Sequence, residues 1–157
     1  MTNLSLKNYE KNRIYFLSLH TLSEEKLMKE TEHSKWSIRE IIGHIYYWDK
    51  YLLYVMVPEM FEGAALPEFP DHDTYNEKAM KHIIKFTSTK ELLNDFSITR
   101  DSLLHKIEAL PQDTTFTIGK GKRSFSPDTF MAMFVEHDDH HIKQIEAFLK
   151  RQNMKLC

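Results

Sequence analysis

The apolar residues of this chain recur every three or four positions along four long segments. This spacing places them on one face of an α-helix, and it is the feature that most constrains the fold. Glycine, which weakens helices, occurs only 4 times in 157 residues. The pattern predicts an all-α chain in which four long helices form a bundle and bury their apolar faces against one another.

Local signals set the ends of the first two long helices. The first is expected from Leu4 to Thr21 and has the least regular apolar face of the four. A short extra turn is expected from Glu24 to Lys29. The sequence Ser37-Ile38-Arg39-Glu40 has the S-x-x-E form of a capping box and starts the second long helix, which stops near Pro58.

The second half of the chain contains the other two long helices. Residues 57–71 are expected to form a loop, and a short helix follows from about Tyr75 to Phe86. The third long helix carries a seam of apolar residues from Leu92 to Leu110, and Pro111 ends it. Ser126-Pro127 suits the start of the fourth, which is expected to run to about Arg151.

One stretch departs from helical spacing. Within Thr114 to Phe125, the segments TFTI and RSFS flank the sequence Gly-Lys-Gly-Lys. This arrangement predicts a small β-hairpin directly before the last helix. An isolated hairpin is marginally stable in water, so it has to pack on the helices or on a partner.

Composition narrows the class of protein. A net charge of -2 does not favour nucleic-acid binding, and 41% hydrophobic with 28% charged residues is typical of one ordered domain, expected over residues 1–157. No apolar run approaches the roughly 20 residues of a membrane span, and the N-terminus is too charged for a signal peptide. A cytoplasmic protein is expected. Its single cysteine, Cys157, cannot form an internal disulfide.

The fourth helix carries two histidines in the middle of its apolar face. In order, this face is expected to present Phe130, Phe134, His137, His141, Ile145 and Phe148. Because His137 and His141 lie one turn apart, both side chains can reach one ion, and H-x-x-x-H on a helix is a common arrangement for zinc. The alternative is a pair of structural histidines, whose ring nitrogens would then need hydrogen-bond partners in the core.

A third histidine could complete the set. His44 lies one turn from both Ile41 and Trp48, at the edge of the apolar face of the second helix. Three neutral imidazoles suit Zn, Ni, Fe or Co and leave at least one position open on the ion. His140 is an alternative ligand in place of His141. Most of the other histidines are expected at the surface or in loops; these are His33, His72, His82 and His105. His20 is the exception, because it could face the core.

Polar residues near these histidines could orient the imidazoles through hydrogen bonds. The alternative is that most of them are simply solvated charges at the surface. The candidates are Glu40, Glu136, Asp138, Asp139 and Gln144.

Two segments of the chain match family signatures. Residues 35–45, KWSIREIIGHI, match W-S-x-x-E-x-x-x-H, and residues 136–145, EHDDHHIKQI, match H-x-x-H-H-x-x-Q. Together they resemble the signatures of the DinB-like superfamily, a YfiT-like group of metal-dependent enzymes. Lys143 stands where the second signature usually has glycine, but this difference lies outside the proposed ligands.

The resemblance implies a four-helix bundle with a long crossover, often dimeric, so a homodimer is a possible assembly. It places the metal ligands at His44, His137 and His141, and it makes His140 a non-ligand. Members with known activities are mostly transferases that use low-molecular-weight thiols such as bacillithiol or mycothiol. The implied function is therefore metal-dependent transfer of such a thiol to small electrophiles. A metal-dependent hydrolase and a non-catalytic, metal-binding stress-response bundle are the alternatives.

Overall fold

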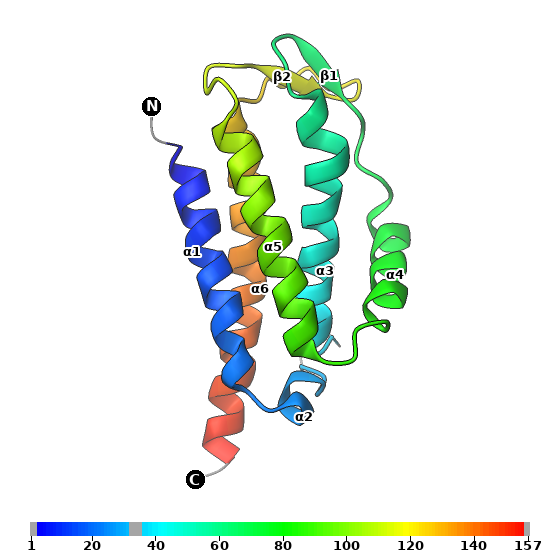
Figure 1. Cartoon of the computed structure of the whole chain (residues 1–157), viewed down its shortest axis with the longest axis vertical. Coiled ribbons are helices and arrows are strands. Elements are labelled where there is room, and N and C mark those ends of the chain that lie inside the picture. The colour runs from blue at the N-terminus through cyan, green and yellow to red at the C-terminus, as the bar shows by residue number, and fades with distance from the viewer. Residues whose placement is uncertain (1–2, 32–35, 156–157) are drawn as a thin grey trace.

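Four long helices lie side by side and form the body of the protein (Figure 1). The computed structural model describes residues 3–31 and 36–155, so His33 and Cys157 lie outside the described residues. The predicted all-α four-helix bundle is confirmed. No helix within the described ranges is long and apolar enough to cross a membrane. The long helices are α1, Leu4–Ser18; α3, Ile38–Tyr51; α5, Thr89–Glu108; and α6, Pro127–Lys155.

Shorter elements extend and connect the long helices. A 3-10 turn continues α1, and a π-helical turn followed by a second 3-10 turn continues α3. The extra turn expected near Glu24 is present as α2, which Ser23 caps. The bounds of these elements are Leu19–Thr21 for the first 3-10 turn, Glu24–Leu27 for α2, Leu52–Met56 for the π-helical turn and Val57–Glu59 for the second 3-10 turn.

The chain passes from α3 to α5 through a long crossover. These two helices run in the same direction, so the connection has to return along the bundle (Figure 1). The crossover contains a strand, β1, Ala64–Leu66, within the segment expected to be loop, and then α4, His72–Ile83. Around the bundle, α1 packs against α5 and α6, and α5 packs against α3, whereas α3 and α6 approach each other at few points. These two helices therefore leave room for side chains to meet between them.

The strand expected before the last helix pairs differently from the prediction. β2, Phe116–Ile118, lies parallel to β1, with Ala64 opposite Phe116. Only a single antiparallel bridge, between Phe116 and Phe125, remains of the expected hairpin. The backbone of Gly119 takes a φ of 57°, which glycine tolerates best, and its N–H donates to the carbonyl oxygen of Leu66 at 2.7 Å. This hydrogen bond joins the end of β2 to the end of β1.

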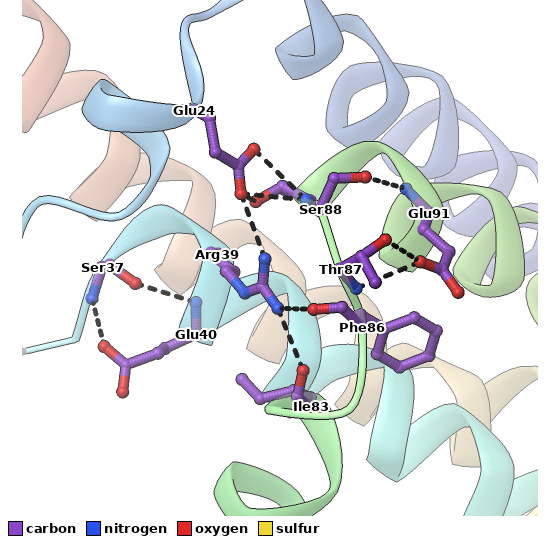
Figure 2. A network of polar contacts seen from close by, with 10 residues as sticks. Glu24, Ser37, Arg39, Glu40, Ile83, Phe86, Thr87, Ser88 and Glu91 are labelled. Carbon is purple, nitrogen blue, oxygen red and sulfur yellow. Dashed lines mark hydrogen bonds and ion pairs between the residues drawn. The ribbon is translucent and has the colours of Figure 1, made fainter.

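The predicted capping box at the start of α3 is confirmed. The Glu40 N–H donates to Ser37 Oγ at 3.1 Å, and the Ser37 N–H donates to Glu40 Oε1 at 3.0 Å (Figure 2). Both donors would otherwise lack a partner at the helix end. Glu40 is therefore used in capping and does not orient an imidazole.

Arg39 ties the start of α3 to the end of α4. Its guanidinium donates to the carbonyl oxygens of Ile83 and Phe86 at 3.1 and 2.6 Å, and to Glu24 at 3.1 Å (Figure 2). One turn further along α3, a Cβ added at Gly43 would lie 2.5 Å from the Ile83 side chain. The absence of a side chain at Gly43 therefore lets α4 pack closely against α3, beside His44.

A buried ionic network joins all four long helices. Arg100 of α5, which is 0% exposed, donates to both carboxylate oxygens of Asp49 of α3 and of Asp138 of α6, at 2.8 to 3.2 Å. From α1, the Tyr9 hydroxyl donates to Asp49, and Asn12 donates to Asp138 at 3.4 Å. We call these five residues the arginine cluster. It bridges α3 and α6 where their direct contacts are few.

Candidate metal centre

The three histidines singled out from the sequence meet between α3 and α6. His44 Nε2 lies 2.9 Å from His137 Nε2, which lies 3.2 Å from His141 Nε2. All three residues offer a ring nitrogen within 4.8 Å of the other two. His44 and His141 are buried, with 4% and 7% of their surface exposed, and His137 is half-buried. We call these three residues the histidine cluster.

Asn76 of α4 fixes the orientation of the His44 ring. Its Oδ1 lies 3.1 Å from the indole Nε1 of Trp48 and 3.0 Å from His44 Nδ1. Because an indole N–H can only donate, the Asn76 atom between them is the acceptor oxygen. His44 Nδ1 must therefore carry the ring proton, which leaves His44 Nε2 with an unprotonated lone pair.

Gln144 fixes the His141 ring in the same way. His141 Nδ1 lies 2.8 Å from Gln144 Oε1 and donates to it. The Nε2 of His141 is then also unprotonated and faces His137. Gln144 was one of the residues that the sequence suggested for this role, whereas Asn76 was not.

The Nε2 atoms of the cluster cannot all find hydrogen-bond donors among themselves. If His137 carries its proton on Nε2, it can donate to His44 or to His141, but not to both. If the proton is on Nδ1, three lone pairs face one another. In the first tautomer the lone pair of His44 or of His141 is left without a donor, and in the second unprotonated nitrogens meet at 2.9 and 3.2 Å. An unmatched contact of this kind is costly in a buried site.

Protonation does not relieve this conflict at neutral pH. Burial, together with the neighbouring imidazoles of His137 and His141, lowers the pKa of His44 to about 2. Burial, followed by the charges of His141 and His140, lowers the pKa of His137 to about 3. Burial also lowers the pKa of His141. The cluster is therefore neutral, as metal-ligating imidazoles have to be.

The geometry of the cluster suits one divalent transition-metal ion. Imidazole nitrogens about 2.1 Å from an ion lie about 3.0 Å apart in octahedral and about 3.4 Å apart in tetrahedral coordination. The two separations from His137 Nε2, 2.9 and 3.2 Å, are close to these values. Amide oxygens that accept the opposite ring N–H, as those of Asn76 and Gln144 do, are typical partners of metal-ligating histidines.

A cavity of about 500 Å³ opens beside the histidine cluster. Its wall includes the three histidines of the cluster together with aromatic and apolar side chains. This volume is within the range of small-molecule sites. The other lining residues are Trp36, Trp48, Phe69, His72, Asn76, Met133, Phe134 and His140.

The remaining candidate residues have other roles. His140 is exposed at the rim of the cavity, with its Nε2 3.4 Å from Gln144 Nε2. Asp138 belongs to the arginine cluster, and Asp139 accepts from Asn12 at 3.1 Å. Glu136 is exposed.

The other histidines differ partly from expectation. His20 is exposed, so the suggestion that it faces the core is wrong. His72 is a surface residue as expected, but it also borders the cavity, with its ring 5.4 Å from that of Trp48. His82 is half-buried, and its ring lies 5.4 Å from that of Tyr47. His105 is exposed.

Comparisons with known proteins agree with this fold. The family model of the DinB superfamily matches residues 9–145. No curated protein matches the chain significantly. Among solved structures, YfiT from Bacillus subtilis matches with a TM-score of 0.69 and 14% identity, over 95% of this chain and 86% of YfiT. YfiT is described as a probable metal-dependent hydrolase with an unusual four-helix bundle topology.

Proposed function

Because this chain belongs to the DinB superfamily, we propose that His44, His137 and His141 hold one divalent metal ion and that the protein is a metal-dependent hydrolase of small molecules. The observation that carries the proposal is the convergence of three Nε2 atoms that lack matching protons, beside a cavity of about 500 Å³. The description of YfiT as a probable metal-dependent hydrolase supports the choice of reaction class.

The ligand set leaves the ion open to a further ligand. Among the described residues, no other histidine, cysteine, aspartate or glutamate joins the group of three. Three protein ligands and an open position are typical of catalytic sites, whereas structural zinc sites are closed by four. When bound, a divalent ion lowers the pKa of a water molecule or thiol at its open position and polarises a substrate carbonyl.

The chain's own residues prepare this site in two ways. Asn76 and Gln144 hold the Nδ1 protons of His44 and His141, so both Nε2 lone pairs are presented without rearrangement. The aromatic wall of the cavity would cover part of a bound substrate, and replacing water there strengthens electrostatic interactions at the ion.

Thiol transfer is the second candidate reaction. It is what the family resemblance implies, and a thiol would use the same open position. Hydrolysis is preferred because no lysine or arginine among the described residues lines the cavity to pair with a carboxylate-bearing thiol of the bacillithiol type. A non-catalytic metal-binding role is less consistent with an open ligand set beside a cavity.

The experiment compares both reactions in protein without a histidine tag. The protein is stripped with a chelator, reloaded with Zn²⁺, Ni²⁺ or Co²⁺, and assayed with neutral aryl esters and amides, and with bacillithiol plus an electrophile. We expect hydrolysis that depends on the metal, is lost in His141→Ala, and persists in the exposed control His105→Ala. Hydrolysis that survives both chelation and His141→Ala would contradict the proposal, and metal-dependent thiol transfer alone would replace it with the second candidate.

A further inference from the structure

The wall of the cavity is mainly aromatic. The Trp36 ring lies 4.8 Å from that of His44 and 6.4 Å from that of His141, so an indole borders the proposed metal site. The centroid of the Phe69 ring lies 6.1 Å from that of Trp48 and 6.0 Å from that of Phe134. These three rings therefore form a continuous surface. A ligand bound at the open position of the ion would contact this surface.

This aromatic surface is held in place by contacts within the protein. The Phe69 ring stacks on Phe130, which is fully buried, at 6.3 Å. The indole N–H of Trp48 is used in its hydrogen bond to Asn76, so Trp48 offers the cavity an apolar ring. A preformed apolar wall binds apolar groups without the cost of ordering side chains.

The lining provides little to match a charged group. None of the described residues on the cavity wall is a lysine, arginine, aspartate or glutamate. The oxygen of Asn76 already accepts two hydrogen bonds, from His44 and Trp48. An ammonium group on the body of a substrate would lose water here without gaining an ionic partner, and a carboxylate or phosphate away from the ion would meet only the imidazole rings of His72 and His140 on the wall. An ammonium group would in addition be repelled by a divalent ion.

We propose that this site takes uncharged small molecules in which an aryl or branched alkyl group adjoins the atoms that reach the metal. The substrate class rests on the proposed function, because it assumes an ion held by the histidine cluster. For a hydrolase, it corresponds to neutral esters or amides with an aromatic or apolar group next to the scissile bond. Hydrophobic burial on the wall then supplies most of the affinity, and the metal supplies the orientation.

The test uses Co²⁺-loaded protein and three probes of the open position. Imidazole tests the position alone, 4-phenylimidazole adds an uncharged ring, and 4-(imidazol-4-yl)benzoate adds the same ring with a carboxylate. Binding is followed through the visible absorption of the cobalt ion. We expect 4-phenylimidazole to bind at least tenfold more tightly than imidazole, because the phenyl ring is removed from water, and the benzoate to lose most of this gain.

A matched pair of variants locates the effect on the wall. Phe134→Ala should weaken 4-phenylimidazole about fivefold or more and leave imidazole unchanged, since Phe134 borders the cavity without ligating the ion. Phe61→Ala should change neither probe, because Phe61 is 60% exposed and lies outside the cavity lining. Unchanged imidazole binding also shows that the variant site is intact.

Different outcomes would refute the metal site and the substrate class. If imidazole leaves the cobalt spectrum of the wild-type protein unchanged, the open metal position itself is refuted, and with it the proposed function. If imidazole binds but the phenyl ring adds no affinity, or the benzoate binds as tightly as 4-phenylimidazole, the substrate class is wrong while the metal site stands. The comparison of the three probes on wild-type protein tests the substrate class even if Phe134→Ala does not fold.

Discussion

Two buried polar clusters share helices α3 and α6, yet they differ in how completely their groups are matched. In the arginine cluster, Arg100 forms four hydrogen bonds to two carboxylates, and its guanidinium lies 3.5 Å from the centre of the Tyr9 ring. In the histidine cluster, three lone-pair positions share at most one proton. Burial alone therefore does not indicate function: the arginine cluster is matched internally and joins the helices, whereas the histidine cluster leaves lone pairs that a bound cation would satisfy.

The two clusters are also neighbours along the chain. His137 and Asp138 are consecutive in α6 but belong to different clusters, and α3 contributes both His44 and Asp49. Because α3 and α6 have few direct contacts, the bridge through Arg100 sets the spacing of the two helices that carry the histidines. The arginine cluster therefore supports the site without belonging to it.

The largest effect on stability should come from removing the cation of the arginine cluster. Arg100→Met leaves two buried carboxylates without their cation, and we expect it to lower the free energy of unfolding by about 3–5 kcal/mol. Urea denaturation of the metal-free protein measures this change. Arg123→Met, at an exposed position where the guanidinium lies over the Phe125 ring, should stay within about 1 kcal/mol of wild type. A loss below about 1 kcal/mol in Arg100→Met would show that the arginine cluster does not stabilise the fold.

Metal should stabilise the protein only by binding to the histidine cluster. At a free Zn²⁺ concentration about 1,000 times Kd, binding to the native state adds about 4 kcal/mol to the unfolding free energy. The double variant His137→Ala, His141→Ala should lose this gain while its metal-free stability stays within about 1 kcal/mol of wild type. Equal stabilisation of wild type and the double variant by zinc would place the ion elsewhere.

Removing the residue that orients His44 should weaken the metal site without abolishing it. Asn76→Leu deprives His44 Nδ1 of its acceptor, and we expect metal affinity to fall about 10- to 100-fold. A competition titration against a coloured chelator measures the Kd. Asn8→Leu makes the same chemical change at an exposed position on α1 and serves as the control. Equal affinities in the two variants would mean that Asn76 does not prepare the ligand.

The smallest effect is expected at Gly43, where α4 packs against α3. A methyl group there would meet Ile83 at 2.5 Å, and the strain is partly offset by the better helix propensity of alanine. Gly43→Ala should therefore cost about 1 kcal/mol and reduce metal affinity a few-fold, because α4 carries Asn76. The added substitution Ile83→Ala makes room for the methyl group and should restore metal affinity. No recovery in the double variant would rule out this steric cause.

Local signals in the sequence were enough to predict the helices and their starts. The capping box at Ser37 and the helical spacing around His137 depend on neighbours three or four residues away, so they can be found in one sequence. The proximity of His44 to the other two histidines depends on how helices pack, and its expected place in the site came from the family resemblance. The structure brings the three together, and their role as ligands stays a prediction.

Features that depend on distant segments could not be found in this way. The parallel pairing of Ala64–Leu66 with Phe116–Ile118 has no local signal, whereas the Gly-Lys-Gly-Lys turn favoured a hairpin. Arg100 stands beside the apolar seam of α5, but arginine is mostly exposed in proteins, so its burial could not be anticipated. Asn76 reaches His44 only because α4 folds back onto α3. The possible homodimer stays a prediction.

The proposed metal site requires that the histidine cluster bind one divalent ion per chain. A Co²⁺ titration, followed by visible absorption, tests this in protein purified without a histidine tag and stripped of metal. We expect saturation at about one ion per chain in wild type and in His140→Ala, and a loss of high-affinity binding in His44→Ala, His137→Ala and His141→Ala. Wild-type protein that takes up no cobalt, or three ligand variants that bind it as tightly as wild type, would rule out this metal site.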